Sequence, residues 1–241
     1  MNLLAILTLL SCVAAAGDVA VSNLSVDEIV RRLVEMDKVR TSMLRGYIAE
    51  RQYVAENRKF SKHAEVSVEE SFAPPDQKTL KVVAEDGSPL VRRKVIDKLI
   101  EAELDATRDD NRDQTHVTSQ NYSFRLSGTA QVDGYSCFVL EVTPKSAKKY
   151  LMRGQIWVDQ EDFAIVRMEG NPAKNPSIWT RKVRFVRRYE KHGPFWLPAS
   201  VESETEIVVA GTSTLKIRYS DYRIETRGES PASERIAPEP R

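Results

Sequence analysis

The chain has 241 residues, of which 41% are hydrophobic and 29% are charged, an ordinary globular composition with enough apolar material for a core. This length suits one large β domain or two small ones, because all-β domains often reach about 200–250 residues. The formal net charge of +1 excludes a general electrostatic attraction to nucleic acid or to an anionic membrane.

The first sixteen residues predict an export signal. Residues 3–10 form an apolar run, and residues 14–16 supply three alanines of the kind that a signal peptidase reads. The run is too short to cross a bilayer, which takes about 20 apolar residues. Residues 9–12, Leu-Leu-Ser-Cys, also resemble a bacterial lipobox, so lipidation of Cys12 with membrane anchoring is the alternative to cleavage after the alanines. Both routes predict an exported protein.

Beyond the signal, Cys137 is the only thiol in the chain. A single cysteine cannot form an internal disulfide, so the stability of the fold has to come from its core. Cys137 begins the apolar run Cys137–Leu140, and we therefore expect a buried and unreactive thiol rather than a nucleophile.

Residues 23–44 predict a first helix, in which Ser25 and Glu28 form a capping box. Its apolar residues recur at helical spacing and make a wide face. They are Val26, Ile29, Val30, Leu33, Met36, Val39 and Met43. Such a face either fills a core or covers a cavity, where the two methionines would give an adaptable surface.

Three strands are expected after this helix, at residues 46–56, 62–72 and 79–84. A second helix is predicted from Ser88 to about Thr107, because Ser88 is a good cap and Pro89 suits the first helical position.

The second half of the chain predicts antiparallel strands joined by short turns. They are expected at 122–126, 135–143, around Trp157, around Phe163, at 179–190, at 196–209 and at 214–225. Asp133-Gly134 is a turn dipeptide. In the strand 196–209, apolar residues alternate with Glu202 and Glu204, which predicts one buried and one wet face.

Metal and cofactor motifs are missing. None of the three histidines, His63, His116 and His192, has a partner at metal-ligand spacing. The loop 108–120 begins like a calcium loop, but Gln114 replaces its turn glycine. We find no phosphate-binding loop or nucleophile elbow, and the acidic cluster at 159–162 is explained by a hairpin turn. The sequence predicts a protein without catalysis, metal or cofactor.

Residues 145–191 contain twelve Lys and Arg against five Asp and Glu, a local charge of +7. Solvated strand faces explain this excess in one interpretation. In the other, the excess attracts a lipid head group or an acidic protein partner. The candidate partner-binding residues are Arg181, Lys182, Arg184, Arg187 and Arg188.

The order of these elements resembles the bacterial outer-membrane lipoprotein carrier superfamily (LolA/LolB/RseB-like). The most similar pieces are Tyr135–Lys145 and Gly154–Glu169, the latter with its Gly-x-x-Trp-Val-Asp hairpin. The resemblance implies an α+β, mainly β fold: a half-open, curved antiparallel β-barrel with helices covering its concave face. It would form one domain at 17–227, between a signal peptide at 1–16 and a proline-bearing, disordered tail at 228–241.

The resemblance also implies a function: periplasmic, non-catalytic binding of lipid or lipoprotein acyl chains in an apolar cavity. The alternative is an envelope sensor or assembly factor of the RseB type, which would bind a protein. The candidate cargo-binding residues are Leu33, Met36, Met43, Tyr47, Tyr53, Trp157, Ile165, Phe185, Val201 and Ile207.

One family feature is missing. The carrier has an early Arg-Pro-x-x-Phe-Arg-type motif whose arginine helps to hold its lid closed, whereas residues 72–80 here read Phe-Ala-Pro-Pro-Asp-Gln-Lys-Thr-Leu. No arginine can be carried over, so the resemblance does not imply transport of lipoproteins by the known carrier route.

Overall fold

The structure, a computed structural model, describes residues 24–75, 77–107, 115–175, 180–208 and 210–228. The predicted signal peptide with Cys12, the start of the calcium-like loop and nearly all of the predicted tail lie outside these residues. The domain limits of 17 and 227 therefore stay a prediction.

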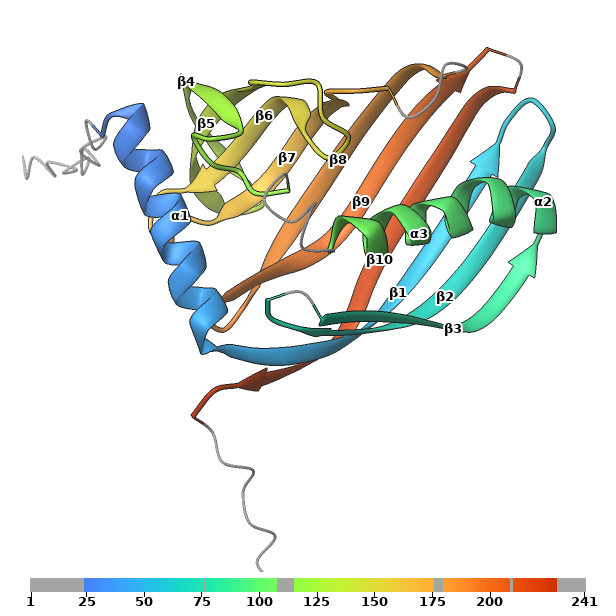
Figure 1. Ribbon diagram of the computed structural model, residues 1–241, viewed down its shortest axis with the longest axis horizontal. Helices are drawn as coiled ribbons and strands as arrows, with labels where there is room; N and C mark the ends of the chain where they lie inside the picture. Colours follow the sequence, from blue (N-terminus) through green and yellow to red (C-terminus); the bar gives the residue numbers. More distant parts are fainter. Residues whose placement is uncertain (1–23, 76, 108–114, 176–179, 209, 229–241) are drawn as a thin grey trace, which may run out of the picture.

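Ten strands form one antiparallel sheet in the order β3-β2-β1-β10-β9-β8-β7-β6-β5-β4. They are β1 (Leu44–Asn57), β2 (Lys62–Ala73), β3 (Gln77–Gly87), β4 (Tyr122–Val132), β5 (Tyr135–Pro144), β6 (Met152–Asp159), β7 (Ile165–Pro172), β8 (Thr180–His192), β9 (Phe195–Ile207) and β10 (Gly211–Thr226). The edge strands β3 and β4 do not pair with each other in the described part of the chain, so the curved sheet stays open (Figure 1). The predicted mainly β fold, a half-open antiparallel barrel, is confirmed.

The sheet consists of two meanders joined at a single seam. Strands β1 to β3 pair in sequence order, as do β4 to β10, and the seam pairs β1 with β10, placing Leu44 opposite Thr226. All other neighbouring strands are consecutive in the chain. Short hairpins therefore build most of the sheet, and one long-range pairing holds its two parts together.

The first helix, α1 (Val26–Met43), begins as the capping box predicts, because the Ser25 hydroxyl accepts a hydrogen bond from the Glu28 amide at 3.2 Å. The second predicted helix is divided into α2 (Pro89–Val91), a π-helical turn η1 (Arg92–Ile96) and α3 (Asp97–Ala106). None of the described helices is long and apolar enough to span a membrane.

The strand expected around Phe163 does not include Phe163 itself. Phe163 lies in the β6–β7 turn with a φ of 48°, and β7 starts at Ile165. The Asp159 carboxylate accepts hydrogen bonds from the amides of Glu161 and Asp162 at 3.1 and 2.7 Å. The acidic cluster is thus part of a hairpin turn, as the sequence predicts.

Two groups of helices cover the concave face of the sheet at different places (Figure 1). Ile29, Val30 and Leu33 of α1 pack on a core cluster built mainly from β4, β5 and β6. Ile96 and its neighbours on α2, η1 and α3 pack on β1, β2 and β10. The strands β8 and β9 lie between these two covered areas.

The thiol of Cys137 is buried, as predicted. Burial, followed by the charges of Asp159 and Asp133, raises its pKa to about 12. The thiol therefore stays protonated at neutral pH, which removes the thiolate that nucleophilic chemistry requires.

Replacing a fully buried side chain in the α1-covered cluster will test where the core lies. Ile156→Ala is expected to lower the free energy of unfolding by about 2–5 kcal/mol, because Ile156 is 0% exposed and its truncation leaves a cavity. Met36→Ala, at a side chain 38% exposed, should change it by less than about 0.5 kcal/mol. Urea unfolding of both variants measures the difference, and equal losses would contradict this placement of the core.

Candidate functional site

A cleft of about 1110 Å³ runs along α1. Its other walls come from the turn at Pro74-Pro75, from residues 115–120, and from the sheet at Ile165, Tyr189 and Trp196. Small-molecule sites usually measure about 300–1,000 Å³, so this cleft has room for a ligand of considerable size.

The two flanks of α1 differ in what they face. Val34 and Leu33 line the cleft, whereas Met36 and Met43 do not. Residues two apart on a helix point to nearly opposite sides, so Met36 lies on the flank away from Val34. Met36 and Met43 are 38% and 36% exposed. The adaptable methionine surface expected over a cavity is therefore found on the outer flank.

The C-terminal part of α1 is fixed to the sheet by Arg40, a nearly buried guanidinium. Its Nη1 donates to the carbonyl oxygen of Asp162 at 2.8 Å, and its Nη2 to that of Phe163 at 3.2 Å. The Asp162 carboxylate in turn binds Trp196 Nε1 at 2.8 Å and Lys191 Nζ at 2.6 Å. These contacts join α1, the β6–β7 turn and the β8–β9 hairpin.

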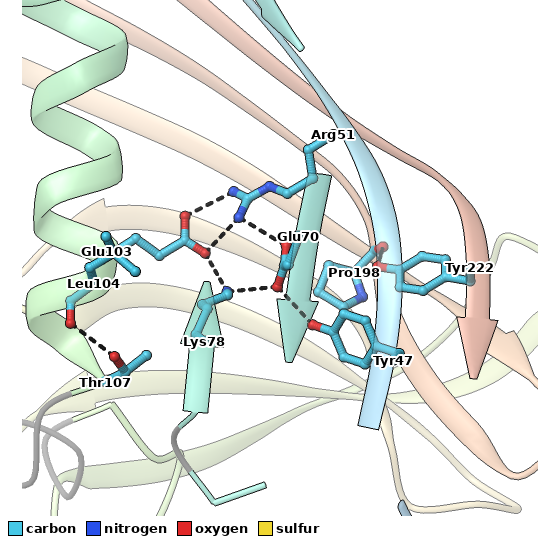
Figure 2. A network of polar contacts seen from close by, with 9 residues as sticks. All are labelled: Tyr47, Arg51, Glu70, Lys78, Glu103, Leu104, Thr107, Pro198 and Tyr222. Carbon is cyan, nitrogen blue, oxygen red and sulfur yellow. Dashed lines mark hydrogen bonds and ion pairs between the residues drawn. The ribbon is translucent and has the colours of Figure 1, made fainter. Parts of the chain in front are cut away.

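A second site, on the concave face below α3, is a buried polar network (Figure 2). Arg51 of β1 donates to Glu70 of β2 at 2.9 Å and to Glu103 of α3 at 2.8 and 3.0 Å. Lys78 of β3 lies 2.9 Å from Glu70 and 2.6 Å from Glu103. The Tyr47 hydroxyl donates to Glu70 at 2.9 Å. Two positive and two negative groups balance, so the network as a whole is neutral.

This network holds α3 against the sheet. The side chains of Arg51 and Glu70 are fully buried, and the Arg51 guanidinium also lies 4.9 and 4.7 Å from the ring centres of Tyr53 and Tyr219. The network was not predicted from the sequence. A signal existed, because Arg51 and Glu70 stand at positions that are otherwise apolar on two alternating strands.

The predicted cargo-binding residues do not line one cavity. Leu33 and Ile165 line the cleft along α1. Tyr47 and Tyr53 are buried core residues of β1. The half-buried Phe185 packs toward the α1-covered cluster.

The remaining three candidates lie elsewhere. The half-buried Val201 packs on the cluster below α3, and Ile207 is half-buried at the last residue of β9. Trp157 lies on the opposite, convex face, because its neighbours Ile156 and Val158 are buried in the α1-covered cluster. The guanidinium of Arg167 covers its ring at 4.9 Å.

The predicted basic residues of β8 do not form one surface, because strand alternation divides them between two faces. On the convex face Arg184 forms an ion pair with Glu169, and Arg188 pairs with Glu202 at 3.2 Å. The adjacent strand β9 also places Glu206 opposite Lys182 and Glu204 opposite Arg184. An acidic strand therefore compensates the basic one, which a charge count along the chain cannot detect.

The described residues contain no group of three or more His, Cys, Asp or Glu side chains able to hold a metal ion.

Residues 105–229, slightly more than half of the chain, match the model of a family described as an uncharacterized protein. No curated protein matches the chain. Among solved structures, it is similar to a DUF1329 family protein from Desulfovibrio piger, with 16% identity and a TM-score of 0.41 over 84% of this chain and 93% of that one. It is also similar to a LolA superfamily protein from Nitrosomonas europaea, with 13% identity and a TM-score of 0.39 over 84% of this chain and 94% of that one.

Removing one charge from the buried network should be costly. Glu70→Gln is expected to lower the free energy of unfolding by about 3–5 kcal/mol, because it leaves the two positive charges of Arg51 and Lys78 with the single carboxylate of Glu103 in a buried site. Glu69→Gln, at an exposed neighbour on the other face, should cost less than about 1 kcal/mol. Urea unfolding compares the two, and similar losses would mean that the network does not hold this part of the fold.

Acid should weaken the same network. Burial by itself would raise the pKa of Glu103, but Lys78 and Arg51 outweigh this effect and lower it from 4.5 to about 2. The stabilisation is therefore complete above about pH 4.5 and is lost as the pH falls toward 2. Thermal unfolding between pH 5 and 2.5 should show a smaller pH dependence for Glu103→Gln than for the wild type, and no change for Glu101→Gln. Equal slopes for all three proteins would contradict this assignment.

Proposed function

We propose that this chain, which belongs to the family whose model matches residues 105–229, is a non-catalytic carrier of acyl chains. The resemblance of its element order to the outer-membrane lipoprotein carrier superfamily supports the proposal. The ligand is a lipid or a lipoprotein, and its chain lies in the cleft along α1. The observation that carries this proposal is the cleft itself, about 1110 Å³ between a helix and an open sheet.

The apolar part of the cleft supports reversible binding of a chain. Leu33 and Val34 of α1 line it, as do Ile165 and Trp196 of the sheet. Each methylene group transferred from water into such a surrounding contributes about 0.8 kcal/mol. A few such groups give useful affinity without permanent capture, which is what a carrier requires.

The proposed location is the periplasm. It follows from the export signal expected at residues 1–16 and from the envelope setting of the superfamily that the chain resembles. If Cys12 is lipidated, the protein acts at a membrane surface, and if the signal is cleaved after residue 16, it diffuses freely.

The alternative function, a sensor or assembly factor that binds an acidic protein through β8, has less support. Arg184 and Arg188 are already paired with Glu169 and Glu202, so the charges of two of the five candidate residues are compensated within the protein. Binding of this kind would weaken markedly with added salt, whereas binding of an acyl chain in the cleft would hardly change.

Native mass spectrometry of the mature protein, purified without detergent, tests the proposal directly. We expect an adduct of lipid mass that is lost on denaturation, and lipid extraction then identifies its class. Refolded protein that takes up no added lipid at any ratio would contradict the proposal.

Two substitutions on α1 test the place of binding. Val34→Trp fills the cleft and should weaken binding of a fluorescent acyl probe at least about tenfold, a loss of about 1.4 kcal/mol. Met36→Trp adds the same bulk on the outer flank and should leave the affinity unchanged. Fluorescence titration measures both affinities, and equal effects of the two variants would exclude the cleft as the binding site.

A further inference from the structure

Arg187 is a cation in the middle of the concave face. It lies on β8 opposite Met168 of β7 and Val201 of β9. Met168 packs toward the cluster below α1, and Val201 packs on the cluster below α3. Arg187 therefore stands between the two helix-covered areas, on the face opposite to Arg184 and Arg188.

The charge of Arg187 is not part of an ion pair within the described part of the chain. No carboxylate of the described residues forms an ion pair with it, although its neighbours Arg184 and Arg188 both have one. The groups that act electrostatically on its guanidinium are Tyr189, Tyr219 and Glu103. The Glu103 carboxylate is already bound by Arg51 and Lys78 within their neutral network.

Arg187 lies close to a residue that lines the cleft along α1. Tyr189 lines the cleft, and its hydroxyl donates to Met168 Sδ at 3.4 Å. Arg187 interacts with Tyr189 and lies opposite Met168. Arg187 itself is not among the residues that line the cleft, but it is exposed on the concave face beside Tyr189.

We infer that Arg187 binds the anionic head group of the ligand, a carboxylate or a phosphate, while the apolar chain lies in the cleft. This inference rests on the proposed function and specifies its ligand as an acidic amphiphile. A guanidinium presents a planar set of donors that matches these anions, and it is always protonated in proteins. A hydrogen bond between charged groups is roughly twice as strong as a neutral one.

Ligands that share one chain and differ in the head group will test this. We compare dodecanoate, dodecyl phosphate and dodecanol by displacement of a fluorescent apolar probe from the mature protein. The wild type should bind both anions about tenfold more tightly than the alcohol. Arg187→Gln should reduce this preference to about onefold, and Arg187→Lys should keep part of it.

Arg188→Gln is the matched control, since it removes one positive charge from the next residue on the convex face. It should keep the wild-type preference, and both glutamine variants should keep the wild-type unfolding midpoint. A preference that survives Arg187→Gln, or that both variants lose equally, would overturn the assignment.

The same titrations separate this inference from the proposed function. Tight binding of dodecanol and dodecanoate with equal affinity would support the proposed carrier function but refute the role of Arg187. The other outcome is that none of the three ligands binds while inorganic phosphate still protects Arg187 from chemical modification. The proposed carrier function would then be wrong, and Arg187 would bind only a free anion.

Discussion

An antiparallel sheet that curves without closing has to cover its apolar concave face with something other than strands. Here that constraint is met by two separate helical covers, α1 at one side and α2 to α3 at the other. Because the covers are separate, the central strands β8 and β9 are left between them, and the cleft borders this region.

The two covers are held in different ways, and the difference bears on how the protein could work. Below α3, the ion pairs of Arg51 with Glu70 and Glu103 fix the helix in one orientation. A buried neutral network of this kind adds little net stability compared with apolar packing, but it tolerates no loss of a partner. The α1 side relies on apolar contacts and on two hydrogen bonds from Arg40 to backbone carbonyls. The α1 cover is therefore the one that can adjust to a ligand at a lower cost.

Local patterns in the sequence predict much of this fold. The capping box at Ser25, the turn at Asp133-Gly134 and the alternation in β9 all act between near neighbours in the chain. What could not be predicted depends on neighbours across strands. The compensation of β8 by Glu202 and Glu204 requires the register of β8 and β9. A wide apolar face on α1 likewise does not show which of its flanks borders the cleft. The sequence therefore predicts Met36 as a cavity residue, whereas Val34 lines the cleft in the structure.

The seam between β1 and β10 has a consequence for how the chain folds. Every other pair of neighbouring strands is joined by a short hairpin or lies within one meander, so it can form early from local contacts. The pairing of β1 with β10 joins the first and the last strand in chain order. Long-range pairings of this kind form slowly, because the entropy of closing a long loop is lost before the contacts form. During vectorial synthesis, β1 is the first strand to emerge and β10 the last. The edge of β1 that pairs with β10 therefore stays unpaired until almost the entire chain has been synthesised. At this stage the protein is most exposed to mispairing of its strands.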